Sequence, residues 1–258
     1  MLLEEFDKNK DAILNPEDFH YKMKEMPKTC VSFFSKSLMK HIVENYAATQ
    51  IAKIENSTAT FPVYKINING TDLAIFQSAV GAPACVSNYE ELISMGIKNF
   101  LLVGCCGCLD KNIEEYSIII PTSAIRDEGT SYHYAPKYDE TKINSKVVEI
   151  IENTLNDLRL NYKKGKTWTT DAIFRETKDK VEKRKKQGAI TVEMECSAMN
   201  IVSEFRKVNF GQIFYAADNL DGEQYEPRNL INGEKTINDK KKIIPIAIEC
   251  AINIDKTL

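Results

Sequence analysis

Two carboxylates stand directly after an apolar stretch of the sequence, in Glu193-Met194-Glu195. The stretch 189–192 is typical of a buried strand, and a carboxylate placed beside it is costly to bury unless something binds it. Alternation along a strand predicts that both side chains point to the same side, where they would bind a polar ligand. They would equally serve as caps of the following helix, because negative charge is favourable at a helix N-terminus. From these residues alone both interpretations stand.

Asp218 presents the same choice, because it follows the apolar stretch 213–217. In open α/β sheets, ligands bind outside the carboxyl ends of the strands, so polar residues that follow apolar runs are the ones to examine. Two further strand ends contain glycine turns, Val80-Gly81-Ala82-Pro83 and Gly104-Cys105-Cys106-Gly107. Their uncrowded backbone N–H groups suit an anion, although most such turns only reverse the chain.

The stretch from Arg126 to Tyr134 gathers charged, hydroxyl, imidazole and aromatic side chains within nine positions. Such a mixture is suited to a polar, planar ligand, and an ordinary surface loop has a similar composition. Of the three histidines in the chain, only His133 lies in a neighbourhood of this kind, which makes it the candidate for a functional histidine.

The elements that would position these residues alternate between strand-like and helix-like patterns from residue 71 onward. We expect one α/β domain over residues 1–258, a three-layer sandwich around a mainly parallel or mixed sheet, with 1–30 as a polar lead-in. Pro121 is expected to close the third strand. The predicted strands are 73–76, 99–103, 117–120, 166–170, 189–192 and 211–216, and the predicted helices are 86–95, 143–158, 178–187 and 241–251.

Composition excludes several classes of function. Net charge is −3 with mixed signs along the chain, which argues against a nucleic-acid partner. We expect a cytoplasmic protein, since no signal peptide or membrane span is evident. The seven cysteines are expected to be reduced and not to bind metal, because they form no second CxxC pair. A calcium loop at 7–18 is disfavoured because Ala12 replaces the required glycine.

Taken together, these motifs resemble the purine nucleoside and uridine phosphorylases over about residues 60–250. The resemblance implies a three-layer α/β fold, a dimer or a hexamer built from dimers, and phosphate as co-substrate with no cofactor. The matching elements are Gly81-Ala-Pro83, Glu90-Glu-Leu92, Gly96, Val103-Gly-Cys-Cys-Gly107, Arg126 to Tyr134, Thr170-Asp171, Phe174 and Val192-Glu-Met-Glu195.

The resemblance also implies roles for individual residues. Glu195 would bind ribose hydroxyls and Met194 would pack against the sugar, which fits a reaction that builds positive charge on the ring. Asp218 would protonate the leaving base, as in purine-cleaving members, with Asp221 close enough for the alignment to slip. The remaining candidates are Cys105, Gly107, Phe174, Arg175 and Glu193 for substrate, Gly81 and Arg126 for phosphate, and Arg228 as a helper.

The sequence departs from the family at its phosphate-binding positions. Nothing in 26–32 reproduces the Gly-Asp-Pro-x-Arg element, and Leu102 and Cys105 replace an arginine and a hydroxyl residue. Either Arg126, Arg175 or Lys28 restores the lost charge, or water replaces phosphate and the protein is a nucleosidase. A non-catalytic nucleoside-binding relative is the third interpretation, disfavoured by the paired Glu195 and Asp218. We predict phosphorolysis of a purine nucleoside or uridine, because both arginines fall in segments expected to face the ligand.

Overall fold

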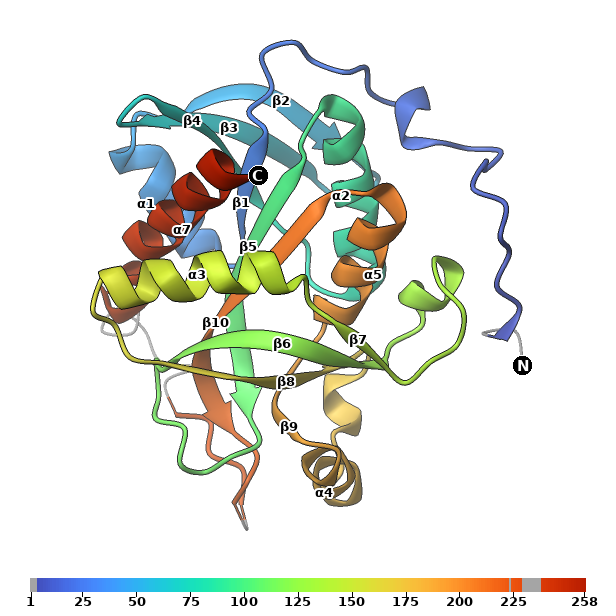
Figure 1. Ribbon diagram of the computed structural model, residues 1–258, viewed down its shortest axis with the longest axis vertical. Helices are drawn as coiled ribbons and strands as arrows, with labels where there is room; N and C mark the ends of the chain where they lie inside the picture. Colours follow the sequence, from blue (N-terminus) through green and yellow to red (C-terminus); the bar gives the residue numbers. More distant parts are fainter. Residues whose placement is uncertain (1–3, 223, 229–237) are drawn as a thin grey trace.

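The structure is a computed structural model that describes residues 4–222, 224–228 and 238–258, and a single mixed sheet runs through this part of the chain (Figure 1). Its strands are β1 Thr29–Phe33, β2 Thr49–Glu55, β3 Thr60–Ile68, β4 Thr71–Gln77, β5 Asn99–Cys108, β6 Ile118–Asp127, β7 Glu140–Lys142, β8 Tyr162–Thr170, β9 Ala189–Glu193 and β10 Asn209–Asn219. The helices are α1 Lys36–Asn45, α2 Ala82–Met95, α3 Ser145–Asp157, α4 Lys178–Lys186, α5 Cys196–Arg206 and α7 Ile243–Thr257, and the short 3-10 turns are η2 Pro16–Asp18, η3 Thr130–His133 and η4 Ile173–Arg175.

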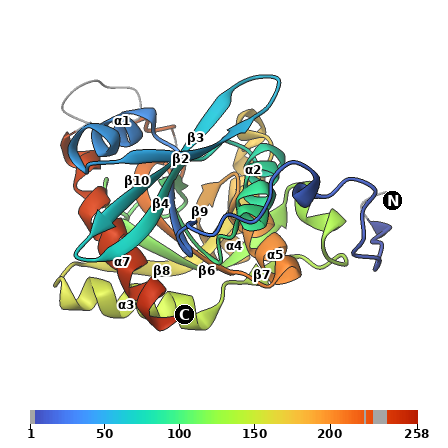
Figure 2. The same cartoon turned by 90° about the horizontal axis from the view of Figure 1, so that it is seen from above.

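The strand order is β10-β6-β8-β9-β5-β1-β4-β3-β2, and β10 also pairs with β5. Strands β5, β10, β6, β8 and β9 therefore pair in a closed ring. The other strands, β1 to β4, extend the sheet outward from β5. The pairs β1–β4, β1–β5 and β5–β10 are parallel, and β2–β3 and β3–β4 are antiparallel. Helices α3 and α7 lie on one face, and α2 and α5 on the other (Figure 2). The expected three-layer α/β fold with a mixed sheet is confirmed.

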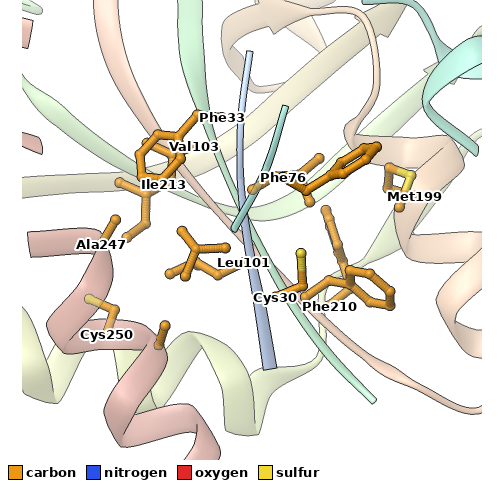
Figure 3. Close-up of a cluster of buried hydrophobic side chains, with 14 of the residues drawn as sticks. Cys30, Phe33, Phe76, Leu101, Val103, Met199, Phe210, Ile213, Ala247 and Cys250 are labelled. Atoms are coloured by element: carbon orange, nitrogen blue, oxygen red, sulfur yellow. The ribbon is translucent and has the colours of Figure 1, made fainter. Parts of the chain in front are cut away.

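The core lies on both faces of the central strands, as their nearly continuous apolar sequences require. On one face Val103 and Ile213 lie toward Ala247 of α7, and on the other Phe210 lies toward Met199 of α5 (Figure 3). All of these side chains are buried. Each large apolar side chain buried in this way contributes about 1.5–3 kcal/mol, so the strand ends project from a rigid support.

One sequence-based expectation about the elements was wrong. Pro121 does not close a strand, because β6 continues to Asp127. The pairing of β6 with β8 shifts register between Pro121 and Ser123, an irregularity at which a missing N–H is tolerated. The expected lead-in gives way to β1 at Thr29, and this strand lies between β4 and β5.

Candidate active site

Glu195 lies where the N-termini of two helices meet. It immediately precedes α5 and is 5% exposed, and its Oε1 accepts a hydrogen bond of 2.6 Å from the backbone N–H of Gly81. Gly81 precedes α2 with φ +91°, a conformation that favours glycine. Burial, followed by the nearby carboxylate of Glu193, raises the pKa of Glu195. The carboxyl group is therefore fixed by the backbone, with capacity left for a ligand.

Glu193 has a different environment, because β9 ends at this residue and Glu195 is no longer part of the strand. Its Oε2 accepts hydrogen bonds from the backbone N–H groups of Glu195 and Cys196, at 2.8 and 2.7 Å. Its Oε1 accepts from Thr169 Oγ1 at 2.5 Å. The capping interpretation thus describes Glu193, whereas the Glu195 side chain makes no capping bond to α5. A contact between Glu193 and substrate stays a prediction.

Asp218 and Cys105 come together because β10 runs parallel to β5, with Tyr215 opposite Cys105. The register shifts after Ala216, which brings the half-buried Asp218 beside Gly107. A Cβ at Gly107 would lie 2.7 Å from Leu220 Cδ1 and 3.4 Å from Asp218 Oδ1, so a side chain there would displace its neighbours. Glycine at position 107 therefore keeps the approach to Asp218 open.

Cys105 marks the centre of this site. It is the exposed cysteine of the seven, whereas the other six are buried. Desolvation nevertheless raises the pKa of its thiol, and the carboxyl groups of Asp218 and Glu195 both act in the same direction. Two carboxyl groups from separate elements thus lie close to one thiol at the end of β5.

The turn η4 and the segment after β10 add further groups near Asp218. Glu176 is half-buried, and burial, followed by the charge of Asp218, raises its pKa to about 7. The hydroxyl of Tyr225 is hydrogen-bonded to Asp218, and its pKa is raised to about 12, first by desolvation and then by that carboxylate. Neither residue follows an apolar strand, so no signal in the sequence pointed to them. On the same turn, Phe174 is 97% exposed.

Arg175 is exposed on η4 and Met194 is half-buried beside Glu195. Arg126, in contrast, is 4% exposed and stacks between the rings of Tyr132 and Tyr138, at 4.3 and 4.2 Å. Its Nε donates to Ser131 Oγ at 2.8 Å. These contacts hold the segment after β6 in place, and the predicted contact of Arg126 with phosphate has no support among them.

Two other candidates, Lys28 and Asp221, lie away from the site centre, whereas Arg228 lies at its edge, 3.9 Å from Cys108 Sγ on β5. The backbone carbonyl of Lys28 accepts from Lys98 and Asn99, which places Lys28 at the amino end of β5, opposite Cys105. The carboxylate of Asp221 forms an ion pair with Lys185 and is thereby occupied. The Arg228 guanidinium donates to the backbone carbonyl of Ile113 at 3.0 Å. Because Lys28 lies at the other end of β5, the expectation that it supplies positive charge to the site of its own chain is wrong.

A hollow of about 790 Å³ lies away from these residues, between the lead-in and the helices α2 and α5. The exposed His133 lines it, together with Glu90, Tyr134 and Arg206. Within the described ranges, no three His, Cys, Asp or Glu side chains are grouped so that they could hold a metal ion. A search of the same residues finds no helix with the length and apolar character needed to cross a membrane.

Comparison with known proteins agrees with this arrangement. The chain is 25% identical over 202 residues to a purine nucleoside phosphorylase of the DeoD type from Bacillus cereus, covering 76% of this chain and 79% of the relative. It is 25% identical over 167 residues to a guanosine phosphorylase from Halorubrum lacusprofundi, covering 62% and 66%.

Solved structures share the fold. The purine nucleoside phosphorylase of Toxoplasma gondii, in complex with immucillin-H, superposes with a TM-score of 0.78 at 15% identity over 91% of this chain and 94% of that one. The uridine phosphorylase of Vibrio fischeri ES114 gives 0.73 at 21% identity, with coverages of 92% and 94%. The sequence model of the phosphorylase superfamily matches residues 30–258. The chain therefore belongs to the phosphorylase superfamily, among the nucleoside phosphorylases.

Proposed function

We propose that this chain cleaves the N-glycosidic bond of a purine nucleoside, with phosphate as the nucleophile. The observation that carries the proposal is the placement of two carboxyl groups from separate elements at neighbouring strand and helix ends: Glu195 is held by the backbone N–H of Gly81, and Asp218 lies beside Gly107 at the end of β5. A binding protein would have no use for a carboxylic acid poised at a leaving group, whereas a transferase needs one.

The reaction assigns one task to each carboxyl group. A phosphate oxygen attacks the anomeric carbon, the bond from that carbon to the base nitrogen breaks, and its electron pair leaves with the base. Asp218, beside Tyr225 and Glu176, donates a proton to the departing base, and ribose 1-phosphate is the second product. Glu195, held by Gly81, accepts hydrogen bonds from the ribose hydroxyls and stabilises the positive charge that develops on the sugar.

The other site residues would shape the pocket. Met194 would pack against the sugar, and the exposed Phe174 on η4 would cover the base once a ligand is present. Purine is favoured over uracil because Asp218 is placed to protonate a leaving purine, and because the purine and guanosine phosphorylases named above share a quarter of their aligned residues with this chain. We further propose a cytoplasmic homodimer, or a hexamer built from dimers, that requires no cofactor.

A second candidate is hydrolysis, with water in place of phosphate. It is favoured by the apolar surroundings of the family's phosphate positions. Leu102 is fully buried, and the ring of Phe34 lies 2.8 Å from the point that a Cβ of Gly104 would occupy. These apolar side chains offer no hydrogen bond or charge to a phosphate dianion.

A product analysis tests both candidates. Purified protein is incubated with inosine, guanosine, adenosine and uridine, with and without phosphate, and the free base and sugar products are separated by chromatography. Release of a purine base that requires phosphate and yields ribose 1-phosphate supports the proposal. Free ribose formed without phosphate identifies a nucleosidase, and absence of base release from all four substrates contradicts both candidates.

A further inference from the structure

The proposed phosphorolysis requires a cation that the arginine candidates do not supply at Cys105. Arg126 is stacked between two tyrosines, and Lys28 lies at the other end of the sheet. Arg175 is exposed on η4. Phosphate carries up to two negative charges, and in proteins it is held by charge-assisted hydrogen bonds. Arg228, near Cys108, already donates a hydrogen bond to the backbone carbonyl of Ile113. A further cation close to Cys105 would come from another element.

The direction of α7 identifies that element. Near its C-terminus, Asp255 accepts a hydrogen bond of 2.7 Å from Thr29 Oγ1 at the amino end of β1. Toward its N-terminus, Ala247 lies on the side of Val103 and Ile213 (Figure 3). The helix therefore runs antiparallel to β1 and β5, and the chain just before Ile243 reaches the carboxyl end of β5.

Lys240 occupies this position, three residues before α7 begins. Among the charged groups around Cys105, the Lys240 ammonium acts most strongly on the thiol, and it opposes the increase in thiol pKa that desolvation produces. Lys240 is half-buried and has no ion-pair partner within the described part of the chain, whereas the adjacent Asp239 pairs with Lys242 at 2.7 Å. An uncommitted cation therefore faces a site that otherwise carries negative charge.

We propose that Lys240 is the phosphate-binding cation of this site, holding the anion beside Cys105 at the carboxyl end of β5. The assignment rests on the proposed phosphorolysis and adds the group that recognises its anionic co-substrate. It explains how a site with Glu195 and Asp218 attracts a dianion: the ammonium offsets their charge at the place where the nucleophile must bind.

The kinetic test compares Lys240→Met with Lys241→Met, a neighbouring lysine that serves as the matched control. A charged hydrogen bond contributes about 1.5–3 kcal/mol, so we expect the KM for phosphate to rise about 10- to 100-fold in Lys240→Met. The KM for the nucleoside should change less than twofold, and Lys240→Arg should restore most of the phosphate affinity. Equal phosphate KM values for Lys240→Met and Lys241→Met would overturn the assignment.

A binding test needs no turnover. At alkaline pH, which offsets the raised pKa of its thiol, iodoacetamide should alkylate the exposed Cys105, and phosphate should slow this alkylation relative to the phosphate-free rate of the same protein. In Lys240→Met the protection should require at least tenfold more phosphate, whereas protection unchanged by the substitution would contradict the assignment. If the unsubstituted protein releases base and free ribose without phosphate, the proposed phosphorolysis itself fails. If phosphate is required but Lys240→Met has no effect, only the role of Lys240 is wrong.

Discussion

Two groups of carboxylates lie near the carboxyl ends of the strands, and they differ in how completely they are hydrogen-bonded. In the capped cluster, Glu193 accepts three hydrogen bonds from protein groups. Its neighbour Glu128 accepts from the backbone and hydroxyl of Ser131 and from the hydroxyl of Ser197. In the open cluster, Glu195 accepts from the backbone N–H groups of Gly81 and Met194 and from no side chain of the described residues, and Asp218 is bonded to Tyr225.

The difference separates structural from functional carboxylates more clearly than burial does. Glu193 and Glu195 are both buried, at 7% and 5% exposure, and lie two positions apart in the sequence. Protein groups fill the hydrogen-bonding positions of the Glu193 carboxylate, whereas the Glu195 carboxylate can accept further hydrogen bonds. A carboxylate with free acceptor positions can bind a ligand. Substitutions in the open cluster should therefore affect catalysis, and those in the capped cluster should affect stability.

The largest effect is expected for Asp218→Asn, because an amide cannot donate the proton that the leaving base requires. We expect kcat for a purine nucleoside to fall about 10²- to 10⁴-fold with little change in the free energy of unfolding. Steady-state assays of base release provide the measurement. Asp221→Asn is the control, since Asp221 pairs with Lys185. A larger loss in the Asp221 variant than in the Asp218 variant would show that the two residues have been assigned the wrong way round.

Glu195→Gln should reduce kcat/KM about 100-fold, because the amide retains the shape but loses the charge that stabilises the sugar cation. The fold should tolerate this change, since a neutral side chain avoids the desolvation that raises the pKa of Glu195. Kinetics and chemical denaturation of the same preparation test both statements. Full activity combined with a large loss of stability would place Glu195 in the capped cluster.

The carboxylates of the site could be found in the sequence because each follows an apolar stretch that becomes a buried strand. That rule identified Glu193, Glu195 and Asp218, but it could not tell the structural carboxylate from the functional ones. The hydrogen bonds that fix Glu193 come from Thr169 and from the backbone that follows it, and neither contact is visible in the sequence. Arg126 lies near the end of β6. Its stacking between Tyr132 and Tyr138 depends on the path of a loop that no local pattern specifies.

The fold was predictable where strands are apolar throughout, as in β5, and not where polar residues are buried. β1 lies between β4 and β5 and is buried at all five positions, although it contains Thr29 and Ser32. Those hydroxyls are satisfied by distant groups, Asp255 and the carbonyl of Phe76. The closing of β5, β10, β6, β8 and β9 on themselves likewise depends on pairing between segments far apart in the chain.

Glu193→Gln should lower the free energy of unfolding by about 1–3 kcal/mol, because the amide replaces one acceptor oxygen with a donor that faces other donors. Activity per folded molecule should change less than in Glu195→Gln. Desolvation raises the pKa of both carboxyl groups, that of Glu193 to about 7 and that of Glu195 to about 8, so both amides relieve this cost and the difference between the two variants reports the hydrogen bonds. Urea denaturation at pH 8, with Glu195→Gln as the matched variant, measures that difference. Equal stability of the two variants would remove the distinction between the capped and open clusters.

The smallest effect concerns Glu176, whose pKa is raised from 4.5 to about 7. A carboxyl group with a raised pKa binds its proton more tightly in the folded state, so its contribution to stability falls as pH rises from about 4.5 to 7 and is fully unfavourable above that range. Glu176→Gln should therefore raise the thermal unfolding temperature by a few degrees at pH 8 and by much less at pH 5. A gain of equal size at both pH values would show that the stabilisation does not come from the charge of Glu176, and a loss at pH 8 would mean that its carboxylate is held by favourable contacts, as in the capped cluster.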